Sequence, residues 1–309
     1  MALHGRGGYA RRMTGQTDSG DSLSGFFYGL TAYLLWGFLP LYMKALAHIP
    51  PVEVIAHRVI WSVPVALIVL VWLGRTADLK AALTNPRMLG MAALTATIIS
   101  VNWGIYVWAI GADHALDAAL GYYINPLFSI FLGAVLLGER LRGIQWLAIA
   151  LVCIAVGILT WEAGQLPVIA AGLFLTWGFY AYLKRRLPIG PNQGFALEVL
   201  ILLPFGLGYA GWLWWQGTGH FMAGQPFDTW MLFGCGIVTA APLMIYANGA
   251  KRLRLSTIAI MQYIAPTMIF LTAVFLFGEP FSRVKLIAFG FIWAALVVYS
   301  WSVLRRARG

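Results

Sequence analysis

One pattern of residues occurs twice in this chain, 140 positions apart. Residues 119–161 and 259–301, aligned without a gap, agree at 10 of 43 positions. The agreement includes Pro126 with Pro266, a Gly-Glu pair at 138–139 with one at 278–279, and a closing tryptophan. Chance matches in an apolar chain fall on Ala, Leu and Ile, so Pro, Gly and Glu in register indicate a duplication. Repeated apolar segments are typical of transporters, in which two matched halves move about a central site.

The composition is that of a membrane protein. Hydrophobic residues make up 61% of the chain and charged residues only 10%, whereas soluble domains are about 25% charged. Aromatic residues reach 15%, with 14 Trp, which suits side chains that anchor at the membrane interface. Cys153 and Cys235 lie in apolar runs, so we expect small buried thiols rather than a disulfide or a metal site.

Ten segments are long and apolar enough to cross a bilayer, which requires about 20 such residues. They lie near 25–46, 52–74, 88–111, 115–137, 141–161, 167–186, 193–215, 229–250, 257–278 and 282–304. Because lipid offers no partner to an open backbone amide, each span is expected to be helical. The predicted fold is therefore an all-α polytopic membrane protein with ten transmembrane helices.

The basic residues lie mainly on one side of these spans. If the polar, basic N-terminal tail (1–23) is cytoplasmic and disordered, 17 of the 21 Lys and Arg residues fall on the cytoplasmic side; the other four are Lys44, Arg58, Arg283 and Lys285. This bias predicts an inner-membrane protein with both termini in the cytoplasm. It also argues against nucleic acid as a partner, because the charges are spread along one membrane face and form no DNA-reading module.

Five spans per half give the second copy the opposite orientation in the membrane. The sequence therefore predicts two inverted five-helix repeats, at 24–161 and 167–304, related by a pseudo-two-fold axis in the membrane plane. Further matches support this: Trp36-Gly37-Phe38 with Trp177-Gly178-Phe179, Ile105-Tyr106 with Ile245-Tyr246, and Ala56, Val59 and Pro64 with Ala196, Val199 and Pro204.

Several motifs resemble those of a known transporter family. They are AYLLWGFLPLYMK (32–44), EVIAHR (53–58), VNWGIYVWAI (101–110), ALGYYINPL (119–127), GERL (138–141), RLRLSTIAIMQYIAPT (252–267) and FLFGEPFS (275–282). Together they resemble the RarD-type permeases of the EamA branch of the drug/metabolite transporter superfamily, over roughly residues 24–304. Members are described as chloramphenicol-sensitive or chloramphenicol-resistance permeases, and relatives mostly export amino acids and metabolites. The resemblance implies a ten-helix inner-membrane carrier with two EamA repeats, and it implies no particular substrate.

Two prolines in the middle of spans mark the first candidate site. Pro126 and Pro266 each remove a helical hydrogen bond, and in lipid the freed carbonyl must find a partner or line a cavity. Polar neighbours accompany both prolines: Tyr122, Tyr123 and Asn125 in the first copy, and Gln262 and Tyr263 in the second. We interpret these positions as helix breaks at a substrate site; the alternative is a pair of tolerated kinks.

A second polar and aromatic set lies in the third and eighth spans. It contains Asn102, Trp103, Tyr106, Tyr246 and Asn248. Asn102 and Tyr106 are four residues apart and share a helix face. The set either lines the substrate pathway or forms hydrogen bonds between helices, which membrane bundles use routinely.

Two charged residues lie inside predicted spans, where an ion is costly and is a functional candidate by default. Arg58 and Glu198 occupy matching positions in the two repeats, but they lie near opposite faces of the membrane. A direct ion pair between them is therefore not expected. Glu198 is expected to bind the basic cluster 184–186. Arg58 is expected to bind an acid of the outer side: Glu53, Asp113 or Asp117. A fixed structural ion pair is the alternative in both cases.

Trp36 and Trp177 are candidates for cavity walls, with packing as the alternative. Glu139 and Glu279 are expected to cap the following helices or to pair with Arg142 and Arg283. His57, beside Arg58, is expected to be an ordinary hydrogen-bonding residue. No phosphate-binding loop, HExxH, CxxC or GxSxG motif occurs, so we expect no cofactor, no catalytic residues and no ATPase partner.

The function predicted from the sequence is a secondary transporter that exports a small metabolite, an amino-acid-like compound or a drug. Its expected partners are the substrate and the lipid bilayer, and the protein would act as a monomer or a homodimer. Two other classes stay open. A membrane-embedded enzyme would need a clustered catalytic set, whereas the polar residues here are dispersed near mid-depth, and a non-transporting scaffold would show no flux.

Overall fold

The computed structural model describes residues 22–137, 141, 143–250, 252–253 and 255–308, and in this part of the chain helices are the only regular structure. The first half contains α1 (Leu23–Ala45), α2 (Pro51–Trp72), α3 (Thr76–Leu83), α4 (Pro86–Gly111), α5 (Ala115–Leu137) and α6 (Gly143–Ala163). The second half contains α7 (Val168–Arg186), α8 (Pro191–Gln216), α9 (Pro226–Ala250), α10 (Leu255–Met261), α11 (Ile264–Leu271), a π-helical turn (Thr272–Leu276) and α12 (Arg283–Arg308).

The predicted all-α polytopic membrane fold is confirmed. Eight helices of the described chain are long and apolar enough to cross a membrane, and two shorter apolar helical segments, Val168–Lys184 and Ile264–Leu276, occupy the other two predicted spans. Helix starts follow local chemistry, since α2, α4 and α8 each begin with proline, whose missing N–H would have no helical partner there. The short helix α3 was not predicted; it buries Leu79 and Ala82.

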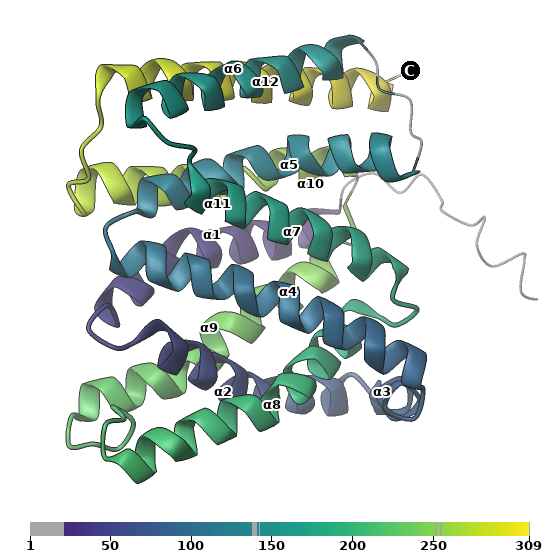
Figure 1. Cartoon of the computed structure of the whole chain (residues 1–309). Coiled ribbons are helices and arrows are strands. Elements are labelled where there is room, and N and C mark those ends of the chain that lie inside the picture. Colours follow the sequence, from purple (N-terminus) through teal and green to yellow (C-terminus); the bar gives the residue numbers. More distant parts are fainter. Residues whose placement is uncertain (1–21, 138–140, 142, 251, 254, 309) are drawn as a thin grey trace, which may run out of the picture.

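The helices are stacked so that the two halves interleave. At one end of the stack α6 packs on α12, and at the other α2 packs on α8 (Figure 1). Between these pairs, α1 packs on α9 and α11, while α7 packs on α4 and α5. Large apolar side chains such as Trp72, Trp161 and Trp214 are more than four-fifths exposed, as expected where helices face lipid.

The ninth predicted span is not one continuous helix. The chain leaves the helix at Gln262 and Tyr263, between α10 and α11, four and three residues before Pro266. Proline clashes with the carbonyl four residues earlier, which places the interruption where it is found. In contrast, α5 runs through Pro126 without interruption, so the predicted break at Pro126 is wrong.

Candidate functional site

A small cavity lies where α1, α2, α4, α7 and α9 meet, and we call it the central cavity. It has a volume of about 40 Å³ and is lined by Trp36, Leu39, Arg58, Ile99, Trp103, Trp177, Tyr180, Val238, Thr239 and Leu243. A water needs about 10–15 Å³, whereas ligand pockets span about 300–1,000 Å³. The cavity therefore holds a few waters in this conformation, and a metabolite would enter only if the helices separated.

Arg58 is the one charged side chain among these lining residues. It is 3% exposed, its Nε donates to Thr239 Oγ1 at 3.0 Å, and its guanidinium lies 4.8 Å from the Trp103 ring centroid. Thr239 Oγ1 itself donates to the Cys235 carbonyl at 2.7 Å, which leaves an oxygen lone pair for Arg58. A desolvated stack of this kind contributes about 2 kcal/mol.

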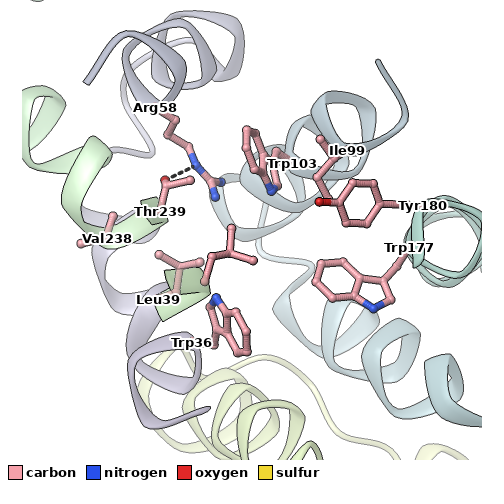
Figure 2. Close-up of a pocket in the computed structure, with 10 residues that line it drawn as sticks. Trp36, Leu39, Arg58, Ile99, Trp103, Trp177, Tyr180, Val238 and Thr239 are labelled. Carbon is pink, nitrogen blue, oxygen red and sulfur yellow. Dashed lines mark hydrogen bonds between the residues drawn. The ribbon is translucent and has the colours of Figure 1, made fainter. Parts of the chain in front are cut away.

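Close helix packing places Arg58 against Thr239. A Cβ added at Gly236 of α9 would overlap the backbone of Trp61 in α2. The hydroxyl of Ser62 also donates to the Gly236 carbonyl at 3.4 Å. These contacts bring the two helices together at the level of the cavity, so Arg58 reaches across the α2–α9 contact. Figure 2 shows Arg58 and Thr239 on one side of the cavity, opposite Trp177 and Tyr180.

The expected acidic partner of Arg58 is absent from the part of the chain that the structure describes. Glu53 binds His220 instead, through the backbone N–H at 2.6 Å and Nδ1 at 2.8 Å. Asp113 pairs with Lys44 and Asp117 with His114. The prediction that Arg58 binds an outer acid is therefore wrong. Its terminal nitrogen Nη1 is buried without a hydrogen-bond partner among the described residues.

Glu198 forms the pair expected from the charge distribution. Its carboxylate lies 2.6 Å from Lys184 Nζ and accepts hydrogen bonds from Thr95 Oγ1 at 2.7 Å and Tyr180 OH at 3.1 Å. This cluster joins α4, α7 and α8. Because the Tyr180 side chain also lines the central cavity, one residue connects the two sites. Glu198 is not among the residues that line the cavity.

The predicted polar and aromatic set lies beside the cavity and only partly in its wall. Trp103 lines it, whereas Asn102 donates to the Leu173 carbonyl at 3.1 Å and to Thr176 Oγ1 at 2.8 Å. Asn102 thus forms the hydrogen bonds between helices that were the alternative interpretation. Tyr122 OH donates to Asn102 Oδ1 at 3.5 Å, and the rings of Tyr122 and Tyr106 are in contact.

An aromatic cluster forms part of the cavity wall. Trp36 lines the cavity and packs against Tyr33 and Tyr246, with ring centroids 5.5 and 5.6 Å away. Trp177 lines the side of the cavity opposite Arg58 and Thr239 (Figure 2). The side chain of Asn248, also predicted for this site, lies outside the described residues.

The residues around the two prolines do not join the central cavity. Tyr123 OH lies 2.8 Å from Thr267 Oγ1. Tyr123, Tyr263 and Thr267 line a separate groove of about 870 Å³ with α12. Asn125 is buried and Gln262 is partly exposed, and neither lines the central cavity. The predicted site around Pro126 and Pro266 therefore lies partly in this groove, and none of its residues lines the central cavity.

Glu279 caps a helix, but not the one that follows it. Its two oxygens accept the N–H groups of Ala115 at 2.6 Å and Leu116 at 2.9 Å, at the start of α5. Among the described ion pairs none joins it to Arg283. Burial raises the pKa of the Glu279 carboxyl above 4.5, against the lowering effect of the two backbone hydrogen bonds. Glu139 lies outside the described residues.

Sequence reasoning did not select Tyr180 or Thr239. Both are ordinary residues in apolar helices, and the repeat pairs them with apolar residues that the sequence did not single out either. At the offset that aligns Trp36 with Trp177, Leu39 aligns with Tyr180. At the 140-residue offset, Ile99 aligns with Thr239 and Trp103 with Leu243. All eight of these residues line the cavity.

Comparison with known proteins places the chain in a family. The model of the EamA-like transporter family matches residues 23–161. An uncharacterized transporter of Vibrio cholerae is 41% identical over 288 residues, which cover 92% of this chain and 94% of that protein. The chain belongs to the EamA-like transporter family. Proteins named RarD are also similar, at 40% identity in Streptomyces exfoliatus (93% of this chain, 91% of that protein) and 37% in Escherichia coli (91% and 95%).

Membership of the EamA-like family identifies the chain as a multi-pass membrane transporter rather than an enzyme. A solved structure, titled only as a crystal structure of a protein, has the same fold, with a TM-score of 0.57 at 21% sequence identity. The likeness covers 91% of this chain and 98% of that one.

Proposed function

We propose that this protein is an inner-membrane secondary transporter that exports a small metabolite through the central cavity by alternating access. The observation that carries the proposal is the cavity itself. It combines one buried, incompletely paired cation with aromatic walls at the point where helices from both halves meet. Few polar groups in a mostly apolar concavity are typical of small-molecule sites.

Two matched halves would provide the movement, and the packing of the helices supports them. Exchanging α1 with α7, α2 with α8, α4 with α9, α5 with α11 and α6 with α12 leaves the α6–α12, α2–α8 and α5–α11 contacts in place and turns the other main contacts into one another. The contact of α1 with α9 becomes that of α7 with α4, and α1 with α11 becomes α7 with α5. The glycines follow the same rule, since a Cβ at Gly37 would overlap Met268 and one at Gly178 would overlap Phe128. The lining pairs described above support a position of the cavity on this axis.

Polar contacts lie near both ends of the helix bundle, where they are suited to break alternately, at one end and then at the other. At the predicted cytoplasmic end, Lys184 and Glu198 join α7 to α8. At the predicted outer end, Glu53 binds His220 and His48 binds Asp228, 2.9 Å apart. We propose that one set separates while the other holds, with both termini in the cytoplasm. No ATPase subunit would be needed, and the protein would act as a monomer or a homodimer in the bilayer.

The test is flux. Metabolites in medium and cytosol would be compared with and without the protein, and the leading compound then tested in proteoliposomes. We expect protein-dependent flux that falls at least tenfold in Trp36→Ala with Trp177→Ala, because both cavity walls are removed. Trp214→Ala, on the exposed surface, is the control. A membrane scaffold would give no flux at all, and equal flux in every variant would remove the cavity from the pathway.

A further inference from the structure

The environment of Arg58 is incomplete without a ligand. Its Nε donates to Thr239 and its guanidinium face packs on Trp103, but Nη1 is buried without a hydrogen-bond partner among the described residues. Figure 2 shows the guanidinium group directed into the cavity. A buried ion that lacks a partner is costly, and the donors of a guanidinium group match the oxygens of a carboxylate in geometry.

Among the residues that the structure describes, no acidic side chain lines the cavity. The described acids all have partners elsewhere. Five of them form ion pairs: Glu198 with Lys184, Asp113 with Lys44, Asp117 with His114, Glu53 with His220, and Asp228 with His48. The other three accept hydrogen bonds: Asp78 from Gln193, Glu162 from Ser282, and Glu279 from the start of α5.

We infer that the transported compound is an organic monoanion, whose carboxylate binds Arg58 and whose flat apolar body lies between the aromatic walls. The inference rests on the proposed function and deepens it. A carboxylate bound to Nη1 supplies the missing acceptor, and the aromatic rings of Trp36, Trp177 and Tyr180 line the space for the rest of the molecule. Charge-assisted hydrogen bonds of this kind are about twice as strong as neutral ones.

The same arrangement selects against other charge types. A compound with a free ammonium group finds no carboxylate in the wall, and its charge would be repelled by Arg58. A zwitterionic amino acid would satisfy Arg58 and leave its ammonium group buried and unpaired, which is costly. Cations, neutral compounds and free amino acids should therefore bind more weakly than a monocarboxylate with the same skeleton.

The competing explanation is that Arg58 only holds α2, α4 and α9 together through Thr239 and Trp103. A series of probes with one carbon skeleton separates the two explanations. The full chain in lipid nanodiscs would be titrated with 3-phenylpropanoate, its amide, 3-phenylpropylamine and phenylalanine, and binding measured by calorimetry. Arg58→Gln removes the charge, Arg58→Lys retains it, and Arg87→Gln removes an exposed cation as the control; size-exclusion chromatography checks that each variant is folded.

We expect the carboxylate to bind at least about tenfold more tightly than the amide, the amine or phenylalanine; tenfold corresponds to about 1.4 kcal/mol. The preference should disappear in Arg58→Gln, return in part in Arg58→Lys and persist in Arg87→Gln. An equal loss of affinity for all four probes in Arg58→Gln, with the preference for the carboxylate unchanged, would show a structural role and overturn the inference. Absence of binding by every probe to the unaltered protein would overturn it as well.

The comparison of metabolites provides a second measure that needs no choice of probe. Compounds whose export depends on the protein should be monocarboxylates, and their export should fail in Arg58→Gln. Export of neutral compounds or cations that survives in Arg58→Gln would overturn this inference and leave the proposed transport intact. No protein-dependent export of any compound would count against both.

Discussion

The cluster around Glu198 gives a quantitative prediction. Glu198→Gln leaves Lys184 near the membrane interior without its counter-ion, 2.6 Å away in the wild type, and weakens the hydrogen bonds from Thr95 and Tyr180. Removing one partner of a buried pair costs about 3–5 kcal/mol. Because the Lys184 side chain is 20% exposed, we expect the lower value, about 3 kcal/mol, or about a hundredfold in the unfolding equilibrium.

A double-mutant cycle isolates this interaction. Lys184→Met alone should be destabilising by a similar amount, because it leaves the carboxylate unpaired. The combination of Lys184→Met with Glu198→Gln should recover most of the loss, since neither buried charge is then left alone. Reversible unfolding in detergent micelles, followed by tryptophan fluorescence, measures each free energy. Strictly additive effects of the two substitutions would refute the pair as the source of the stabilisation.

Three further predictions follow from local geometry. Gly236→Ala should lower the unfolding midpoint, because its Cβ would overlap the α2 backbone, whereas Gly208→Ala, with open space around it, should not; equal midpoints would contradict this contact. The pKa of Glu279 is raised, which means that the Glu279 carboxyl holds its proton more tightly in the folded protein than in the unfolded chain. Its contribution to stability therefore falls as the pH rises from about 4.5 to the raised pKa. Glu279→Gln should remove that part of the pH dependence of the unfolding midpoint, and an unchanged slope would show that the carboxyl does not titrate there. Pro266→Ala should slow amide exchange at the interruption before α11, whereas Pro126→Ala should leave exchange in α5 unchanged; equal effects of the two would contradict the asymmetry of the fold.

Local patterns were sufficient to predict the helices and one ion pair. Apolar runs of the length of a bilayer have to be helical in lipid, so the ten spans follow from hydropathy. The pair of Glu198 with Lys184 followed from depth, because both residues lie near the same end of their helices. The interruption before α11 followed from Pro266, but the same rule gave a wrong result for Pro126, where the surrounding helices keep α5 continuous.

The site was harder to predict, because its wall is made by contacts between distant helices. Arg58 was expected to bind an acid of the outer side, yet Glu53 is bound by His220, which lies 167 residues away in sequence. Thr239 took the place of the acid only because Gly236 lets α9 approach α2. Neither arrangement leaves a local pattern. The repeat offset pairs Leu39 with Tyr180 and Ile99 with Thr239, but nothing in the sequence marks Leu39 or Ile99 as lining a cavity.

The most direct test of the account is whether the central cavity opens to both sides of the membrane. Val238 lines it, and Val238→Cys adds a thiol of similar size without disturbing the contact of Arg58 with Thr239. In a chain whose two native cysteines are replaced by alanine, this thiol would be exposed to a membrane-impermeant reagent from each face of oriented vesicles. We expect labelling from both faces, with a transported monocarboxylate changing the balance between them. Labelling from one face only, or from neither, would contradict alternating access around Arg58.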